Sequence, residues 1–410
     1  MHLNLSTRVA RWALVSRSSS TASFGYSAAR WGCGTTGYHR RIETGPKRRR
    51  AKQVTRSRAT RARPAPLEGR SGGGDFSREK LRTVKRDARA TICIPTVRRL
   101  EFFREALESA VCQSFEDYEV LVSVNSPEPD YFHQISSAIE RVKRTHPSRT
   151  IRLVCPPHFL QIADHMNFMV NEGGGGYWCC LGDDDRMEPH FLETLVPLLD
   201  SHADAGFAFS SYQVIDDQGT LRPELARKMF RSTHLDSLKT DFFPHVGLAR
   251  LALWNALWLP CALFRRSILE AFPFEASNEA PDRDFWLRIA DAQVDLGAVY
   301  AHVPLLNYRV HKEQYSQLTK KGQADWIRSL ERCHSVARAE PKLHNRELAC
   351  TYSMLAKALL VEGDRGGAWR ALLVALRKNP FDRRLYRFVL QAALPTFLLG
   401  FLRAARDGRS

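Results

Sequence analysis

The amino-acid sequence predicts an α/β fold with a mainly parallel β-sheet flanked by helices. Short apolar strands alternate with helical segments four times between residues 90 and 185, which favours a parallel sheet with helices on both faces. Ligands of such sheets bind beyond the carboxyl ends of the strands. An acidic triplet, Asp183–Asp185, directly follows the fourth strand, so the sequence predicts a ligand site at that edge.

Four segments have the composition of buried strands. Thr91–Ile94 is apolar and β-branched, and Pro95 closes it. Similar runs occupy residues 120–122, 151–154 and 177–181. Because these runs are short and mostly apolar, we expect strands that are covered on both faces.

Helical periodicity fills the intervals between these strands. Apolar residues recur at helical spacing over 100–111, and further helices are predicted over 131–144 and 162–170. Four glycines at 173–176 stop the last of these. Another helix is predicted over 188–200, after which the pattern becomes mixed.

The second half of the chain predicts a hairpin around residues 216–219 and then a polar stretch over 221–245. From 317 to 410 the chain is expected to be helical. Its apolar stripes, with Gly363 between them, resemble a single helical hairpin of the tetratricopeptide type. We therefore expect one α/β domain over 88–316 and a helical extension over 317–410.

The positive charge of the chain is confined to its beginning. The net charge is +17; residues 1–90 hold 22 basic and 5 acidic residues, and the remainder holds 39 of each. A folded nucleic-acid-binding domain needs a basic face on the fold itself, so this distribution argues against one. Residues 1–75 lack periodicity and are predicted to be a disordered basic tail. A start codon assigned too far upstream, a transit peptide and a basic arm for an anionic surface remain alternatives.

Cysteines and apolar runs give two further indications. The nine cysteines form no Cys-x-x-Cys pair, and several lie in apolar runs. This pattern predicts core thiols in a reducing compartment rather than disulfides or a zinc site. No apolar run reaches the roughly 18–20 residues of a membrane span. We therefore expect a cytoplasmic protein without a transmembrane segment, and residues 394–402 leave open a peripheral contact at the inner face of the membrane.

The triplet carries the clearest chemical indication. Adjacent carboxylates repel one another unless a cation or strong donors compensate. Their oxygens are hard ligands that suit Mg²⁺ or Mn²⁺, ions that also bind substrate phosphates. Asp183, Asp184 and Asp185 are therefore candidate metal ligands, with a surface acidic loop as the alternative.

Several blocks of the sequence, taken in order, resemble the inverting GT-A glycosyltransferases of family 2. The blocks are Thr91–Thr96, Leu107–Phe115, Asp117–Val122, Asn167, Gly176–Tyr177, Leu181–Asp185, Pro281–Arg288, and Tyr308–His311 with Ser316. Together they cover about residues 90–315. The resemblance implies a GT-A, Rossmann-like sheet and an enzyme that transfers a sugar from a nucleotide-sugar donor to an acceptor hydroxyl with inversion.

The resemblance also implies a cofactor, partners and a setting. These are Mg²⁺ or Mn²⁺, a UDP-, GDP- or dTDP-sugar donor, a glycan, lipid-linked or small-molecule acceptor, and cell-envelope polysaccharide biosynthesis. Asp183 and Asp184 match residues that bind the donor as well as the metal, and His311 matches a residue that touches metal or phosphate. Asp282 matches the catalytic base, with Asp284 as the runner-up.

Donor recognition is expected at the ends of the first two strands. By the same resemblance, Pro95, Thr96 and Val97 line the nucleotide pocket. The family usually has an aspartate that contacts uracil at the end of the second strand, where this sequence has Val124. Either the adjacent Asn125 contacts the nucleobase instead, or the nucleobase preference differs.

Two other function classes remain open. A nucleotidyltransferase normally carries a Gly-rich loop after the first strand, whereas residues 95–99 contain no glycine. A protein that binds nucleotide sugars as a scaffold would keep the same residues, and only turnover distinguishes it from an enzyme. Trp258 and Trp286 could stack on sugar rings, although core packing also explains them.

Overall fold

The computed structural model describes residues 88–126, 128–292, 296–312, 319–381, 385–386 and 389–390. The chain divides into two units, Met1–Gly74 and Asp75–Ser410, and every described residue belongs to the second. The predicted basic tail over 1–75 and the apolar segment 394–402 therefore lie outside the described residues.

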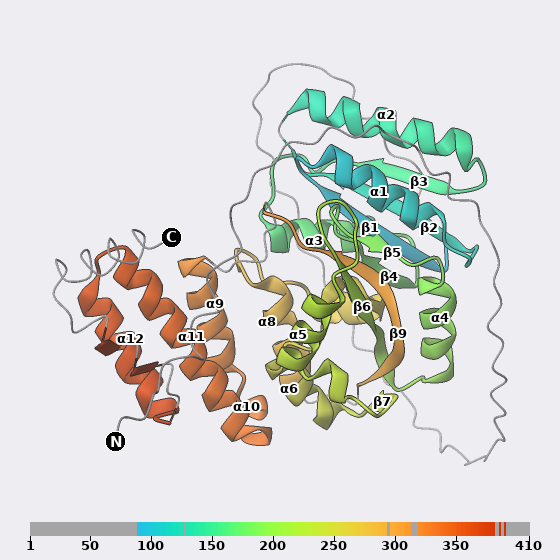
Figure 1. The fold of residues 1–410 in the computed structure, drawn as a ribbon. Coiled ribbons are helices and arrows are strands. Elements are labelled where there is room, and N and C mark those ends of the chain that lie inside the picture. The colour runs from blue at the N-terminus through green and yellow to red at the C-terminus, as the bar shows by residue number, and fades with distance from the viewer. Residues whose placement is uncertain are drawn as a thin grey trace, which may run out of the picture. The chain divides into compact units, whose positions relative to one another are not determined.

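The described strands form one nine-stranded sheet in the order β3-β2-β1-β4-β8-β6-β9-β5, with β7 beside β9 (Figure 1). They are β1 (Ala90–Thr96), β2 (Tyr118–Val124), β3 (Thr150–Val154), β4 (Tyr177–Cys180), β5 (Arg186–Met187), β6 (Ala205–Ile215), β7 (Phe242–Phe243), β8 (Ala262–Arg265) and β9 (Gly297–Arg309). The pairs β1–β2, β2–β3, β1–β4 and β6–β9 are parallel, whereas β5, β7 and β8 run antiparallel to their neighbours. The prediction of a mainly parallel α/β sheet is confirmed.

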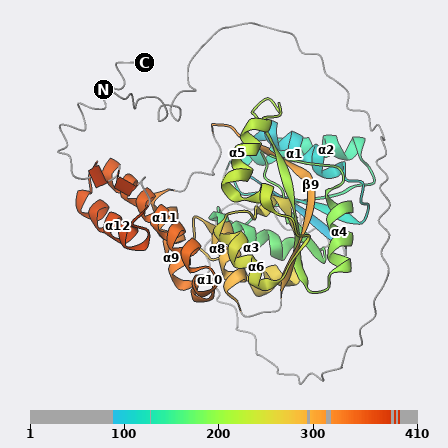
Figure 2. The same ribbon diagram turned by 60° about the horizontal axis from the view of Figure 1, so that its bottom comes forward.

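Helices cover both faces of this sheet. They are α1 (Leu100–Val111), α2 (Pro129–Thr145), α3 (Ile162–Glu172), α4 (Phe191–Ser201), α5 (Pro223–Thr233), α6 (His245–Leu253), α7 (Arg266–Ala271), α8 (Pro281–Asp291), α9 (Lys320–Arg332), α10 (His334–Ala339), α11 (Pro341–Val361) and α12 (Arg365–Lys378). The connections through α1 and α2 step from β1 outward to β3, and α3 leads back past β1 to β4. Because such crossovers are right-handed, α1 and α2 cover one face and α3 the other (Figures 1 and 2).

The order of strands creates a crevice at the carboxyl ends of β1 and β4. β1 pairs with β2 on one side and with β4 on the other, so the chain connections diverge at this point. Crevices at such reversals are the usual ligand sites of open α/β sheets. Pro95–Val97 end β1, Asn125 follows β2 and Asp183–Asp185 follow β4. The residues predicted to bind the donor therefore lie along the same edge.

The hairpin predicted around 216–219 is reduced to a turn. Asp216 Oδ1 accepts hydrogen bonds from the backbone N–H groups of Gln218 and Thr220. Beyond this turn, a single bridge joins Ile215 to Leu221. Pro223 then begins α5, and proline suits the first helical turn because no hydrogen bond is required of its nitrogen there. The chain therefore leaves the sheet before a second strand can form.

Residues 320–378 are almost entirely helical, as α9 to α12. Gly363, which separates α11 from α12, has a φ of 85°, a conformation that favours glycine. Residues 313–318 stand at the predicted domain boundary and lie outside the described residues. The division into a domain over 88–316 and an extension over 317–410 therefore stays a prediction.

Two observations concern the thiols and the membrane. The cysteines among the described residues are all free, and those at 93, 179, 180, 261 and 333 are buried. Within the same part of the chain, no helix combines the length and apolarity needed to cross a membrane.

Candidate active site

A pocket of about 390 Å³ opens at the carboxyl edge of β1 and β4. It brings together the acidic triplet after β4, Asp282 from the start of α8 and Tyr308 from β9. Its other lining residues include Pro95, Arg99, Ile162, Met166, Cys180, Asn255, Leu257, Trp258, Leu259, Pro260, Phe274, Glu279, Arg283 and Arg309. The pocket thus combines a charged wall with an apolar and aromatic wall.

Asp183 is held by the end of β1. Its Oδ2 atom accepts a hydrogen bond of 2.9 Å from Thr96 Oγ1, and the Val97 backbone amide donates another to the carboxylate. Its Oδ1 atom lies 3.3 Å from Arg99 Nη1. Burial, followed by the charge of Asp184, raises the pKa of Asp183 to about 6, although Arg99 and Thr96 act in the opposite direction. An additional positive charge would therefore stabilise this carboxylate.

Asp184 and Asp185 are held by Arg99, by His311 and by the backbone of Arg309. The Asp184 carboxylate pairs with Arg99, and its Oδ2 atom lies 3.0 Å from His311 Nε2. Asp185 is buried, and its Oδ1 atom accepts a hydrogen bond of 2.8 Å from the backbone N–H of Arg309. Burial and the neighbouring Asp184 raise the pKa of Asp185 well above its ordinary value.

Arg309 fixes the turn that carries the triplet. Its buried side chain donates a hydrogen bond of 2.7 Å from Nε to the backbone carbonyl of Asp184. The guanidinium lies over the ring of Phe102 at 4.6 Å from the ring centroid, and Nη2 lies 2.6 Å from Glu105 Oε2. The end of β9 and the start of α1 therefore hold the triplet in place.

The first turn of α8 carries two carboxylates that face different surroundings. Asp282 lines the pocket. Asp284 is fully buried, and its carboxylate accepts hydrogen bonds of 2.7 Å from Arg288 Nε and of 2.7 Å from Ser329 Oγ. The structure thus places the predicted base in the pocket and the runner-up outside it, and the role of Asp282 stays a prediction.

Asn125, which was predicted as a candidate for nucleobase contact, uses its amide on the backbone. Its Nδ2 atom donates a hydrogen bond of 2.8 Å to the Leu160 carbonyl, and its Oδ1 atom accepts one of 2.9 Å from the Leu160 N–H. Neither Asn125 nor the buried Val124 is among the lining residues of the pocket, whereas Pro95 is. In this structure Asn125 holds the segment that leads into α3.

The two tryptophans have different environments. Trp258 lines the pocket, and its ring packs against those of Tyr212 and Tyr308, at centroid distances of 4.8 and 4.5 Å. Trp286 is buried and stacks on Phe264 at 5.4 Å in the core. Only Trp258 is therefore placed to meet a ligand of this pocket.

Two residues of the site were missed by sequence reasoning. The Tyr131 hydroxyl pairs with Thr96 Oγ1 and accepts a hydrogen bond of 3.1 Å from the backbone N–H of Arg99. Arg99 had a usable signal, because it is a cation in the loop after the first strand, at the edge where the triplet lies. Tyr131 had none, since it lies on α2, 35 residues from its partner Thr96.

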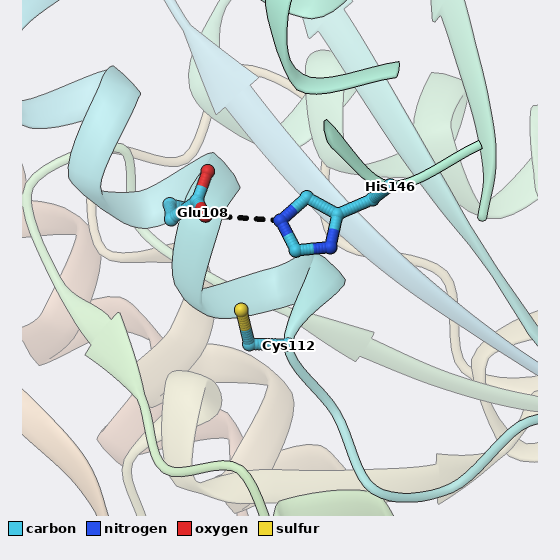
Figure 3. Close-up of side chains that lie close together, drawn as sticks. All are labelled: Glu108, Cys112 and His146. Atoms are coloured by element: carbon cyan, nitrogen blue, oxygen red, sulfur yellow. Dashed lines mark hydrogen bonds and ion pairs between the residues drawn. The ribbon is translucent and has the colours of Figure 1, made fainter. Parts of the chain in front are cut away.

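A separate group of potential metal ligands lies away from the pocket. The ligand atoms of Glu108, Cys112 and His146 lie within 4.8 Å of one another, and no other three described residues form such a group (Figure 3). A contact of 3.0 Å between Glu108 Oε1 and His146 Nε2 accounts for part of this proximity. None of the three lines the pocket.

The triplet itself fits a hard divalent ion. Asp183, Asp184 and Asp185 are not drawn together as closely as that group. However, Mg²⁺ usually takes only one or two carboxylates and completes its shell with water and substrate phosphates. Burial, followed by the charge of Asp184, raises the pKa values of Asp183 and Asp185, although Arg99 and Arg309 act in the opposite direction. Hard oxygen donors in such a place fit Mg²⁺ or Mn²⁺.

The open α/β sheet, with an acidic turn at its switch point, agrees with the fold expected from the sequence, and a comparison with protein families gives the same indication. Residues 91–272 match the family model described as Glycosyl transferase family 2. This part of the chain is similar to glycosyl transferase family 2, the family whose resemblance implied the GT-A fold. The match ends before α8, so it includes Asp183–Asp185 but neither Asp282 nor His311.

Two solved structures illustrate the similarity. The first is S. aureus TarS 1-349 in complex with UDP-GlcNAc, with 12% sequence identity, a TM-score of 0.48, and coverage of 74% of this chain and 88% of that one. The second is the mannosyltransferase PcManGT from Pyrobaculum calidifontis in complex with GDP-Man and Mn²⁺, with 17% identity, a TM-score of 0.45, and coverage of 73% and 89%. No curated protein sequence matches the chain at a significant level.

Proposed function

We propose that this domain transfers a sugar from a nucleotide-sugar donor to an acceptor hydroxyl, with inversion at the anomeric carbon. The observation that carries the proposal is the shared pocket, in which Asp282 lies in the same lining as Asp183, Asp184 and Asp185. The reaction needs both parts: positive charge near the leaving diphosphate and a carboxylate that takes the proton of the attacking hydroxyl.

The donor diphosphate is proposed to bind at the triplet. Asp183, Asp184 and Asp185 would hold Mg²⁺ or Mn²⁺, which when bound stabilises the negative charge of the leaving diphosphate. Arg99 and His311 already contact the triplet and would add positive charge or hydrogen-bond donors at the same place. Thr96 and Val97 orient Asp183 through their hydrogen bonds.

Asp282 is proposed as the base. It stands in the first turn of α8 and lines the pocket that also contains the triplet. The acceptor oxygen attacks the anomeric carbon as its proton passes to Asp282, and the bond to the diphosphate breaks in the same displacement. Because attack and departure occur on opposite faces of the sugar, a single displacement inverts the configuration.

The class of acceptor, the donor nucleotide and the cellular location are further proposals. The wall formed by Leu257, Trp258 and Tyr308 suits the apolar face of a sugar ring, so we propose a glycan, lipid-linked or small-molecule acceptor. No carboxylate ends β2 for uracil, and UDP-, GDP- and dTDP-sugars all stay candidates. The free cysteines of the described residues are consistent with the reducing cytoplasm, with contact at the inner membrane face and a role in cell-envelope polysaccharide synthesis as further proposals.

One observation favours a second candidate, a scaffold that binds nucleotide sugars without turnover. Arg99 pairs with both Asp183 and Asp184, and His311 contacts Asp184 as well. Two carboxylates of the triplet are thus partly neutralised by the chain itself. Turnover of a nucleotide sugar by the purified protein separates the two candidates.

The test is a panel of UDP-, GDP- and dTDP-sugars, each with Mn²⁺, read by thermal shift and by release of nucleoside diphosphate. We expect one nucleotide class to raise the melting temperature and to be turned over. The double variant Asp183→Asn/Asp185→Asn should lose turnover by orders of magnitude, as should the wild type in chelator. Full activity in excess chelator would exclude the metal role, and binding without turnover of any donor would favour the scaffold.

A further inference from the structure

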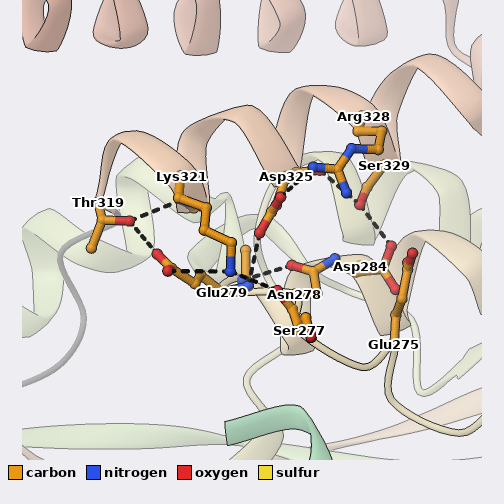
Figure 4. Close-up of polar contacts among 12 residues, drawn as sticks. Glu275, Ser277, Asn278, Glu279, Asp284, Thr319, Lys321, Asp325, Arg328 and Ser329 are labelled. Atoms are coloured by element: carbon orange, nitrogen blue, oxygen red, sulfur yellow. Dashed lines mark hydrogen bonds and ion pairs between the residues drawn. The ribbon is translucent and has the colours of Figure 1, made fainter. Parts of the chain in front are cut away.

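Polar side chains of α9 and of Thr319, the residue before it, hold the segment that leads into α8 and the first turn of α8 (Figure 4). Seven contacts join the two: Thr319 and Lys321 to the Glu279 carboxylate, Lys321 to the Ser277 carbonyl, Asp325 to the Glu279 N–H, Ser329 and Arg332 to Asp284, and Arg332 to Glu275. Contacts of this density are unusual for a loop, whose backbone is normally solvated.

Asp284 is the residue of α8 through which α9 holds this helix. Its side chain is fully buried, and Ser329 Oγ donates a hydrogen bond of 2.7 Å to Oδ1, while Arg332 pairs with the same oxygen. Arg288 Nε lies 2.7 Å from Oδ2. A buried carboxylate is stable only while such partners remain, so the first turn of α8 is tied to the position of α9.

Asp325 anchors the loop side. Its side chain is buried, and its Oδ2 atom accepts a hydrogen bond of 3.1 Å from the backbone N–H of Glu279. Four residues before Asp325, Lys321 Nζ donates a hydrogen bond of 2.9 Å to the carbonyl of Ser277, whose φ of 61° is rare for a residue other than glycine. The contacts from α9 therefore hold a strained backbone in place.

The segment held by α9 also carries residues of the pocket. Glu279, which α9 contacts, and Asp282, two residues before Asp284, both line the pocket. In a helix, two residues span about 200° of rotation, so Asp284 facing α9 directs Asp282 to the other side. We infer that α9 positions the base: Asp325, Ser329 and Arg332 are positioning residues that set where the Asp282 carboxylate stands in the pocket.

This inference rests on the proposed function, because it concerns how the proposed base is placed. Misplacement of a reacting group by about 1 Å can cost about 100-fold in rate while ligand binding elsewhere persists. Loosening α9 should therefore slow turnover without weakening donor binding, since the donor residues belong to β1 and β4.

The test uses the full chain with substitutions on α9. Ser329→Ala removes one donor to Asp284, and Asp325→Ala removes the acceptor for the Glu279 N–H. Asp325→Asn keeps an acceptor oxygen and should restore wild-type behaviour. The matched control is Tyr352→Phe, which removes a hydrogen bond of 2.7 Å between α11 and Glu331 on α9 but leaves the α8 contacts intact.

The first measurement is hydrogen exchange of the amides over 275–283, which needs no ligand. Ser329→Ala and Asp325→Ala should speed exchange there by about tenfold or more, while the amides of β1 and β4 stay protected. Tyr352→Phe and Asp325→Asn should resemble the wild type. Unchanged exchange over 275–283 in both alanine variants would overturn the inference.

The second measurement is donor hydrolysis and donor binding with UDP-GlcNAc, GDP-mannose and a dTDP-sugar. Ser329→Ala and Asp325→Ala should lower kcat by about 10–100-fold, with unchanged donor Kd and binding stoichiometry. A general loss of folded protein would lower the stoichiometry instead. Faster exchange with wild-type kcat overturns the inference but leaves the proposed function intact. A wild type that turns over none of the three donors overturns the proposed function, and the positioning role with it.

Discussion

Asp183 shows at a single residue how burial and neighbouring charges compete. Its pKa is raised from 3.8 to about 6, first by burial and then by Asp184. The folded state therefore binds this proton more tightly than the unfolded state does, so stability from this group is present at low pH and is lost as pH rises from about 4 through about 6. This pH dependence of stability should be clearest in chelator, because a bound cation would stabilise the ionised Asp183 carboxylate.

The corresponding prediction compares the wild type with Asp183→Asn, which cannot titrate. As the pH rises from 4 to 7, the free energy of unfolding of the wild type should fall relative to that of the variant. A pKa difference of about two units between the folded and unfolded states limits this fall to at most about 3 kcal/mol. Chemical denaturation at both pH values in chelator measures the shift. A difference between the two proteins that is independent of pH would contradict the raised pKa.

Asp282→Asn tests the proposed base directly. The amide keeps the size of the side chain but cannot accept the proton of the acceptor hydroxyl, so turnover should fall by about 10²–10⁴-fold. Donor affinity should hardly change, because the residues proposed to bind the donor lie at the ends of β1 and β4. Turnover and donor binding are measured side by side.

Glu279→Gln is the discriminating control for that experiment. Glu279 is the other carboxylate near the start of α8 that lines the pocket. Asp284→Asn is unsuitable, since the buried Asp284 carboxylate has a structural role and its loss would destabilise the fold. If Glu279→Gln abolishes turnover and Asp282→Asn does not, the base is Glu279.

The site residues that could be predicted are those whose position is indicated by their immediate sequence neighbours. Asp183–Asp185 directly follow a strand, so their place at the sheet edge could be predicted. The contacts of Arg99 and Arg309 with Asp184 join residues 85 and 125 positions apart. The position of Arg99 after the first strand indicated its proximity to the triplet, whereas the contact of Arg309 with the Asp184 carbonyl had no local indication. Asn125 follows β2 at the predicted edge of the sheet. Its hydrogen bond with Leu160, however, depends on the fold of a loop that is 35 residues away in the sequence.

At the scale of elements, the glycines before β4 allow a close approach to β1. A Cβ atom on Gly175 would lie 2.6 Å from the backbone carbon of Ala90, whereas one on Gly176 would come no closer than 3.8 Å to the Arg89 carbonyl. Because backbone atoms cannot move aside cheaply, Gly175→Ala should destabilise the fold by about 1–3 kcal/mol. Gly176→Ala is the matched control, and melting temperatures compare the two. Equal melting temperatures would show that β1 can shift at little cost.

Hydrophobic periodicity predicted the strands and helices that bury a regularly spaced set of apolar residues. The strands β1–β4 and the helices α1–α3 were expected close to their observed positions, because each has an apolar pattern of its own. β8 was not foreseen, since its four residues carry no alternation and its place is set by pairing with β4 and β6. Likewise, the pattern after Ile215 could not reveal that Pro223 would begin a helix.

At the scale of the whole molecule, charge separates the beginning of the chain from the rest. Residues 1–90 carry the entire net charge of +17, and the remaining residues are balanced. A chain that begins at Phe76 should therefore keep its melting temperature and donor affinity. It should lose salt-sensitive binding to anionic vesicles, because exposed charges are screened by salt. Loss of a cooperative melting transition in the shorter chain would contradict the prediction of a disordered tail.

The place of β8 in the sheet has a consequence for how this pocket can diversify. β8 meets β4 through two residue pairs, Tyr177–Arg265 and Trp178–Phe264. Much of the wall around Trp258 comes from the chain between β6 and β8, whereas Thr96 and Arg309 hold the triplet from β1 and β9. Because changes that share no contacts combine almost additively, substitutions between β6 and β8 can remodel that wall while the acidic turn keeps its hydrogen bonds. One side of the pocket can thus diverge in sequence while the opposite side is retained.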